Sequence, residues 1–179
     1  TLLLSVGLIP ENELSKMAGI DLDPATMGPK VDHRRETSVE GIFACGNVVH
    51  VHDLVDFATF EARLAGKGAA AYLKESGARA GRRIPVIATE GLRYVLPHFV
   101  DPEAVRREEQ IFFMRSTKPM EKARLMIKSN GGSVKSKRLN YVKPSEMINI
   151  ALGKEEFLYK APEKLRFSLF DEGESYGNE

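Results

Sequence analysis

The residues best suited to chemistry stand together in the stretch His50-Val51-His52-Asp53. Alternate residues of an extended segment project to the same side, so His50 and His52 can face one target, and a carboxylate follows them directly. Paired imidazoles of this kind can ligate zinc or iron. A metal site needs a third ligand, and none is evident nearby in the sequence. We therefore expect no bound metal, and we treat His50 and His52 as candidate catalytic residues or as ordinary hydrogen-bonded loop histidines.

The chain that must position these histidines has the composition of a soluble globular protein. It has 179 residues, of which 42% are hydrophobic and 28% are charged, and its formal net charge is +1. A near-neutral balance gives no reason to expect nucleic acid or an acidic membrane surface as a partner. The one cysteine, Cys45, excludes an intrachain disulfide and a cysteine-rich metal site. A reducing compartment is thus permitted, and we expect a cytoplasmic location.

The apolar opening, residues 1–10, is too short to span a bilayer and has no basic region before it, so we expect neither a membrane span nor a signal peptide. We expect it to form a buried strand that ends at the Gly7 and Pro10 punctuation. A short helix over residues 11–19 and a loop or hairpin over residues 21–30 follow. Because the chain begins with Thr1 and inside a strand, we expect it to be a fragment or a processed product.

One long helix follows the histidine pair, and we expect it to cover residues 53–76. Asp53 is a plausible N-cap, and Gly77 supplies the stop. A stripe of mostly small residues along this helix would allow close packing against a sheet or a cofactor. The stripe consists of Leu54, Ala58, Ala62, Ala65, Ala69 and Leu73.

The second half of the chain differs from the first in composition and in its expected secondary structure. Residues 77–83 are rich in Gly, Ala and Arg, as in a linker. In residues 84–170, strand-like segments alternate with turn signals, as in a small antiparallel β-domain that is either a sandwich or barrel-like. We expect strands over residues 93–100, 110–115, 124–129, 133–142, 146–152 and 164–170. Asn130-Gly131 predicts a hairpin between the third and fourth of these strands. Residues 171–179 form a polar tail.

The stretch Thr37-Ser38-Val39-Glu40-Gly41-Ile42-Phe43-Ala44-Cys45-Gly46-Asn47-Val48 resembles the second FAD fingerprint of the pyridine nucleotide-disulfide oxidoreductase superfamily. That fingerprint has a Thr-Ser turn, a strand such as Ile-Phe-Ala, and then Gly-Asp. Gly7-Leu8-Ile9-Pro10 and Val31-Asp32 match further pieces of the family in order and spacing. The resemblance covers about residues 1–76. It implies an α/β fold in which this region is the closing part of a FAD/NAD(P)-binding Rossmann-like domain.

The resemblance also implies which residues would contact FAD. Gly46 would let the backbone approach the ribityl chain, and Asn47, where the family usually has Asp, would accept a hydrogen bond from a ribityl hydroxyl. The backbone N–H groups of Leu54 and Val55, at the start of the long helix, would stabilise negative charge on the reduced flavin. One of the two histidines would then border the flavin and tune it, or meet substrate.

No Gly-x-Gly-x-x-Gly follows a strand in this chain, so neither dinucleotide pyrophosphate cradle is present. We therefore expect the parent protein to be an oxidoreductase that moves electrons from NAD(P)H through FAD to an unidentified acceptor. This chain alone is expected to bind FAD poorly and to be inactive. The loop around residues 50–56 also looks like that of microbial flavoproteins that work beside FAD-dependent glycerol-3-phosphate or opine-type dehydrogenases.

Two other functions remain open from the sequence. The chain could be a non-catalytic interaction module, with the basic run Lys128, Lys135, Lys137 and Arg138 docking an acidic partner subunit, or with the β-domain forming a homo-oligomer. Alternatively it is one half of a split flavoenzyme, whose FAD site another chain completes. The split enzyme predicts flavin binding only when both chains are mixed.

Overall fold

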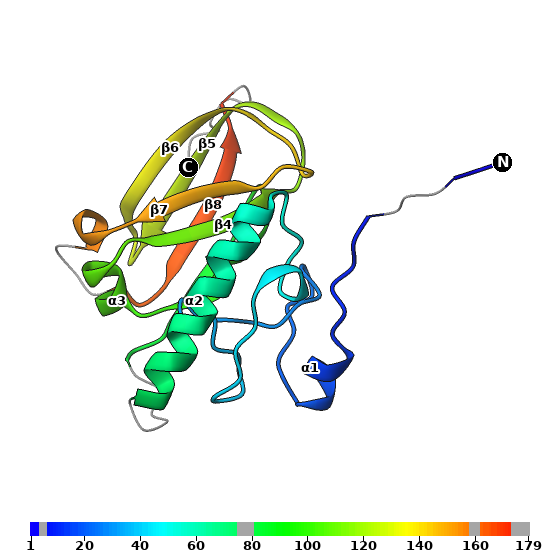
Figure 1. Cartoon of the computed structure of the whole chain (residues 1–179). Coiled ribbons are helices and arrows are strands. Elements are labelled where there is room, and N and C mark those ends of the chain that lie inside the picture. The colour runs from blue at the N-terminus through cyan, green and yellow to red at the C-terminus, as the bar shows by residue number, and fades with distance from the viewer. Residues whose placement is uncertain (4–6, 75–80, 158–161, 173–179) are drawn as a thin grey trace. The chain divides into compact units, whose positions relative to one another are not determined.

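The computed structural model describes residues 1–3, 7–74, 81–157 and 162–172. The chain is a mixed α/β protein that divides into two compact units, Thr1–Gly77 and Ala78–Glu179 (Figure 1). The expected linker, 77–83, and the expected tail, 171–179, lie largely outside the described residues. Within the described part, no helix has the length and apolar character needed to cross a membrane.

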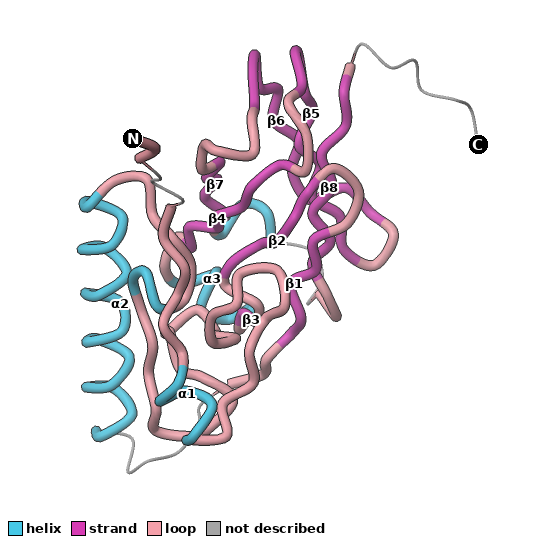
Figure 2. The backbone as a smooth tube through the Cα atoms, turned by 90° about the vertical axis from the view of Figure 1, so that its right-hand side faces the viewer, coloured by secondary structure: helices cyan, strands magenta, loops and turns pink. Residues whose placement is uncertain are grey.

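The Thr1–Gly77 unit consists of one long helix and a series of turns, as the loop-rich path in Figure 2 shows. Its helices are α1 (Glu13–Met17), the 3₁₀ turn η1 (Gly46–Val48) and α2 (Val55–Lys74). The β-structure in its described residues is limited to two antiparallel bridges, Leu22 to Pro29 and Glu36 to Phe43. The expected strand through Ile42, Phe43 and Ala44 is thus reduced to one bridge, and no sheet of a Rossmann-like domain is seen there.

The prediction of a buried opening strand is wrong for the residues described. Residues 1–3 and 7–10 have no regular structure. Their large apolar side chains are 67 to 89% exposed: Leu2, Leu3, Leu8 and Ile9. A strand needs a neighbour to satisfy its backbone hydrogen bonds, and no described strand pairs with this segment. The apolar run therefore has nothing here against which to bury itself.

Helix α2 matches the expected long helix, but its buried face overlaps the predicted stripe only in part. The buried residues are Glu61, Ala65 and Gly68, whereas Leu54 and Leu73 from the predicted stripe are 55% and 78% exposed. The spacing of four and then three residues places all three buried residues on one side of the helix. The prediction included Ala65 and omitted Glu61, because it favoured the apolar residues of the helix.

Gly68 lets α2 pack directly on the backbone of Arg34, in a turn that precedes the helix in the chain. A Cβ at this position would lie 2.3 Å from the carbonyl oxygen of Arg34, whereas a Cβ at Gly66 would meet nothing within 4 Å. We expect Gly68→Ala to lower the free energy of unfolding by about 1–3 kcal/mol, because backbone must move. Gly66→Ala, its matched control in the same helix, should raise it by about 0.5–1 kcal/mol. Urea unfolding followed by circular dichroism measures both, and equal effects at the two sites would contradict this packing.

The Ala78–Glu179 unit is a β-rich domain with one short helix. Its strands are β1 (Ile84–Ala88), β2 (Leu92–Leu96), β3 (Phe99–Val100), β4 (Gln110–Ser116), β5 (Met120–Ser129), β6 (Gly132–Val142), β7 (Ile148–Leu152) and β8 (Leu165–Asp171). Its helical segments are α3 (Pro102–Arg107) and the 3₁₀ turn η2 (Lys154–Phe157).

These strands form two open sheets rather than a closed barrel. One sheet has the order β3-β1-β8-β5-β6 and the other has the order β2-β4-β7. All pairs are antiparallel except β1 with β8, which run parallel. Both sheets contribute to one hydrophobic core, which includes the fully buried Phe112, Leu125, Leu152 and Phe167. The expectation of a β-domain is confirmed, and its barrel-like variant is wrong.

The hairpin between β5 and β6 forms where the sequence predicts it. Ser129 pairs with Gly132, which leaves Asn130 and Gly131 as a two-residue loop. Both loop residues have positive φ, 48° and 80°. Such a loop twists in the same sense as its strands, and Asn-Gly adopts it readily. This turn fixes the register of the two longest strands.

Candidate functional site

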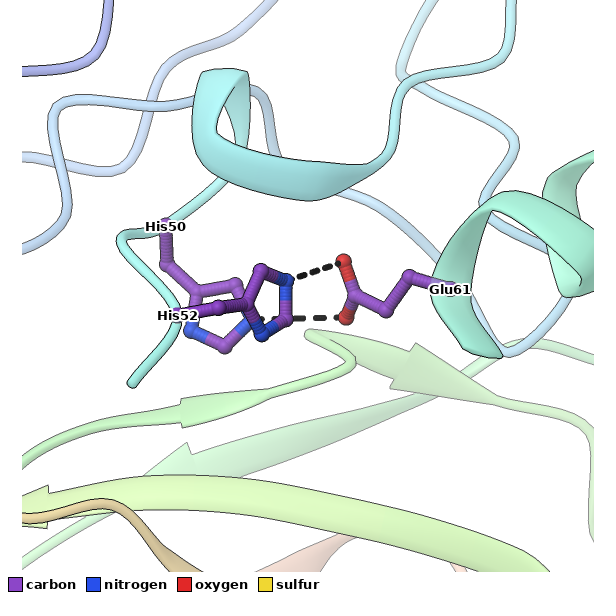
Figure 3. Close-up of side chains that lie close together, drawn as sticks. All are labelled: His50, His52 and Glu61. Atoms are coloured by element: carbon purple, nitrogen blue, oxygen red, sulfur yellow. Dashed lines mark hydrogen bonds and ion pairs between the residues drawn. The ribbon is translucent and has the colours of Figure 1, made fainter. Parts of the chain in front are cut away.

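The two candidate histidines converge on one carboxylate, that of Glu61 on α2 (Figure 3). His50 Nε2 lies 3.3 Å from Glu61 Oε1, and His52 Nε2 lies 3.2 Å from Glu61 Oε2. The two imidazole rings meet edge to face, with their centroids 4.3 Å apart. The alternation expected from the sequence is therefore real: both rings project to the same side and meet a helix residue that follows them in the chain.

Arg35 approaches the same carboxylate from an earlier turn. Its Nη2 atom lies 3.0 Å from Glu61 Oε1. Asp32 builds the turn, because its side-chain Oδ1 accepts the backbone N–H groups of Arg34 and Glu36, at 2.8 and 3.0 Å. Arg35 itself has a φ of 66°, in the left-handed region. The turn that the Asp32 carboxylate stabilises therefore directs the Arg35 side chain into the interior, and it holds the Arg35 backbone in a strained conformation.

The loop that carries the histidines is tied to Glu61 and to itself. The backbone N–H of Gly46 donates to Glu61 Oε2 at 3.1 Å. The N–H of His52 donates to the side-chain oxygen of Asn47 at 3.1 Å, and the N–H of Val49 donates to the carbonyl of Gly46 at 2.9 Å. One carboxylate therefore holds a glycine turn, two imidazoles and a guanidinium in fixed relation to α2.

The cluster is almost completely buried. The side chains of His50, His52, Arg35 and Glu61 are exposed by 2% or less. Burial alone raises the pKa of Glu61, but the Arg35 charge and the hydrogen bonds from the two imidazoles outweigh it and hold that pKa well below its usual range. Burial lowers the pKa of His50, in spite of the neighbouring carboxylate. At neutral pH Glu61 is therefore ionised and His50 is neutral.

These shifts predict that acid weakens the Thr1–Gly77 unit in two stages. The pKa of His50 lies below its ordinary 6.5, so its contribution is full above that value and is lost as the pH falls below it, because the unfolded chain then binds more protons. The pKa of Glu61 lies below its ordinary 4.5, so its contribution is lost at still lower pH. Urea unfolding between pH 8 and 5 isolates the first stage. We expect the free energy of unfolding of His50→Gln to depend less on pH over this range. If its slope against pH equals that of the native chain, His50 is not the group that titrates.

The residues predicted to contact FAD lie at the ends of this arrangement. Gly46 has a φ of 72°, and a Cβ there would meet nothing within 4 Å, so the turn opens onto empty space. Asn47 is exposed, although its oxygen already accepts the N–H of His52. Leu54 and Val55, 55% and 78% exposed, lie where α2 begins, rather than in the histidine cluster. Helix α2 begins at Val55, two residues after the expected N-cap Asp53.

Two members of the cluster, Arg35 and Glu61, are absent from the sequence-based prediction. One signal pointed to Glu61. It stands four residues before Ala65 and seven before Gly68, in line with the small residues on which the helix packs. No comparable signal marks Arg35, because it is one of several charged residues in a turn and its inward direction depends on its positive φ.

Comparison of the chain with protein-family models, with curated proteins and with solved structures gives no match in any of the three. Two features of the chain itself bear on its function: the fingerprint-like sequence, and the geometry of residues 46–55 with the buried cluster beside them.

Proposed function

We propose that this chain is part of an FAD-dependent oxidoreductase that passes a hydride from NAD(P)H to FAD and electrons onward to an acceptor. The observation that carries the proposal is the order of parts in residues 37–55. A Thr-Ser turn leads to a β-bridge at Phe43, then to a glycine turn with open space, and then to the beginning of a 20-residue helix. This is the order in which the superfamily presents its flavin-contacting backbone.

The first contact in this proposal is the turn at Gly46 and Asn47. A side chain at position 46 would fill the space beside the turn, and its φ of 72° also favours glycine. The side-chain oxygen of Asn47 uses one lone pair for the N–H of His52, and a second lone pair is available for a ribityl hydroxyl. The turn thus offers close backbone approach and a polar acceptor at adjacent positions.

The second contact is the N-terminus of α2. The first N–H groups of a helix have no partner inside it, and the dipole of a 20-residue helix places partial positive charge there. Leu54 and Val55 are 55% and 78% exposed at this end of the helix. Negative charge on a reduced flavin would be stabilised at such a position.

In this proposal the histidines act through position rather than by contact with substrate. Both imidazoles are buried against Glu61, with side chains exposed by 2% or less. They hold the loop that joins Gly46 to the beginning of α2, so that the two flavin contacts keep a fixed separation. FAD, when bound, would supply the redox chemistry.

The first experiment is to read the coding sequence upstream of Thr1. Two strand–turn–helix units with Gly-x-Gly-x-x-Gly, in frame, would support the proposal. A start codon or a processing site at Thr1, with no such units, would overturn it for this chain alone. The same reading frame would show whether a Cys-x-x-Cys, and so a redox disulfide, accompanies the flavin.

A variant pair tests the Asn47 contact in the full-length protein. Asn47→Asp keeps an acceptor and is expected to hold FAD as well as the native protein does. Asn47→Leu removes it, and we expect FAD affinity to fall about 2- to 10-fold, the usual effect of one lost hydrogen bond. Flavin fluorescence during titration measures both dissociation constants. Equal affinities for the two variants would exclude Asn47 from the flavin site.

The docking alternative loses support from the side-chain contacts. Lys135 Nζ lies 2.6 Å from Glu156 Oε1, and Arg138 Nε lies 3.3 Å from Glu172 Oε1. The basic run is thus partly neutralised by its own unit and makes a weaker surface for an acidic partner. We retain partner docking, homo-oligomerisation and the split enzyme as alternatives to the flavoenzyme. A cytoplasmic location belongs to the same proposal, because NAD(P)H is the electron donor.

A further inference from the structure

Three side chains in the buried cluster could hold one metal ion between them. One donor atom from each of His50, His52 and Glu61 can be chosen so that all three lie within 4.8 Å of one another. Two neutral imidazoles and one carboxylate are a common ligand set for zinc and for other divalent transition metals. No third ligand is evident next to the histidines in the sequence, and the fold brings Glu61 of α2 to them.

From this geometry we propose that His50, His52 and Glu61 form a binding site for one Zn²⁺ ion. The separations support coordination. A charge-assisted N–H···O⁻ hydrogen bond is usually about 2.7–2.9 Å long. The two imidazole-to-carboxylate separations are longer, 3.3 and 3.2 Å. For zinc bonds of about 2.0–2.1 Å, neighbouring ligand atoms of a tetrahedron lie about 3.3 Å apart. Both imidazole-to-carboxylate separations are close to this value, and three donor atoms, one from each residue, lie within 4.8 Å of one another, so binding of an ion needs only a small closure of the cluster.

Neighbouring groups orient the carboxylate as they do around known metal ligands. Arg35 Nη2 lies 3.0 Å from Oε1, and the Gly46 N–H donates to Oε2 at 3.1 Å. Such outer contacts fix the direction of a ligating carboxylate. The positive charge of Arg35 opposes a cation, so it lowers the affinity of the site and makes Glu61, the anionic ligand, indispensable.

Burial indicates a structural role for the ion. The three ligand side chains are exposed by 2% or less, so no substrate reaches them. The described residues provide three ligands, so a fourth is needed to complete a tetrahedron. The ion would clamp the loop that carries His50 and His52 onto α2. This inference stands apart from the flavin proposal, because it requires neither FAD nor an upstream domain.

The test is a calorimetric titration of the purified full chain, first freed of metal by a chelator, with Zn²⁺. We expect one equivalent to bind. Glu61→Gln, which keeps the shape of the side chain and removes its charge, should weaken binding at least 100-fold, and His52→Ala should do so at least 10-fold. Asp53→Asn is the matched control, because Asp53 is exposed, next to His52, and not among the three ligands. The affinity of Asp53→Asn for Zn²⁺ should equal that of the native chain.

A measurement on the native chain guards against variants that fail to fold. Hydrogen exchange of the metal-free protein is compared with and without Zn²⁺. Protection of residues 46–61, with no change in the Ala78–Glu179 unit, is the expected result. The proposal is overturned if Zn²⁺ leaves the exchange of residues 46–61 unchanged. It is equally overturned if Asp53→Asn loses Zn²⁺ as fully as Glu61→Gln does. Loss of FAD binding elsewhere in the protein would not affect either readout.

Discussion

Replacement of Glu61 by leucine is expected to lower the free energy of unfolding of the Thr1–Gly77 unit by about 3–5 kcal/mol, measured without added metal. The Arg35 side chain is 1% exposed, and its charge lies 3.0 Å from the carboxylate that the variant removes. Its Nε atom is buried and has no hydrogen-bond partner among the described residues. Without Glu61, the buried guanidinium would lose its counter-charge, and the Gly46 N–H would lose its hydrogen-bond acceptor.

Thr59→Ala is the control for Glu61→Leu, because Thr59 lies on the exposed side of the same helix. We expect it to change stability by no more than about 0.5 kcal/mol. Hydrogen exchange of α2, followed by mass spectrometry, reports on this unit separately from the rest of the chain. A loss below about 1 kcal/mol in Glu61→Leu would show that the carboxylate does not hold the cluster together.

Replacement of Phe167 by alanine is expected to cost the Ala78–Glu179 unit about 3–5 kcal/mol. Phe167 on β8 and Phe112 on β4 are both 0% exposed, and their ring centroids lie 5.1 Å apart. The pair connects the two sheets of the unit, since β8 belongs to one and β4 to the other. Truncation of this ring would leave a cavity that neither sheet can close by itself.

Ser136→Ala on the exposed face of β6 serves as the matched control, with an expected change of no more than about 0.5 kcal/mol. Urea unfolding of the full chain, with hydrogen exchange in β4 and β8 as the local probe, measures both variants. If Phe167→Ala were no more destabilising than Ser136→Ala, the two sheets would not share the core described above.

Much of the β-rich unit is predictable because its strands carry a local signal. β4, β6 and β8 each begin and end within about one residue of the predicted ranges, and the Asn130-Gly131 turn joins β5 to β6 as expected. Alternation of apolar and polar residues is a property of the segment itself. It can therefore be read without knowing which strands become neighbours.

β1 and α3 were missed for different reasons. β1 contains Pro85, which argues against a strand, and it is held by parallel pairing with β8 far along the chain. That partner cannot be read from a local pattern. α3 did carry a signal: Asp101 accepts the N–H of Glu103 at 3.0 Å, and Pro102 occupies the first turn. A capping residue followed by proline is sufficient to predict a helix start.

Two of the four residues of the buried cluster, His50 and His52, could be predicted from the sequence. The spacing of His50 and His52 correctly placed both rings on one side, and it identified the loop that matters. Arg35 could not be assigned to it, because a charged residue in a turn is usually solvated. For Glu61 the one signal was its spacing from Ala65 and Gly68. Their burial results from tertiary packing, namely the close approach of α2 at Gly68 to the backbone of Arg34.

The position of β6 at the end of its sheet has a consequence for the behaviour of the chain at high concentration. Among the described strands, β6 has a hydrogen-bonding neighbour on one side only, and it is 11 residues long. An edge of this length can template a strand of another molecule, which is how ordered aggregates begin. Lys137 is exposed on this strand, and the side chain of Arg138 is 74% exposed. The charge of Lys137 and the bulk of the exposed Arg138 side chain make it costly for a second copy to align beside them, so both residues oppose self-templating at this edge.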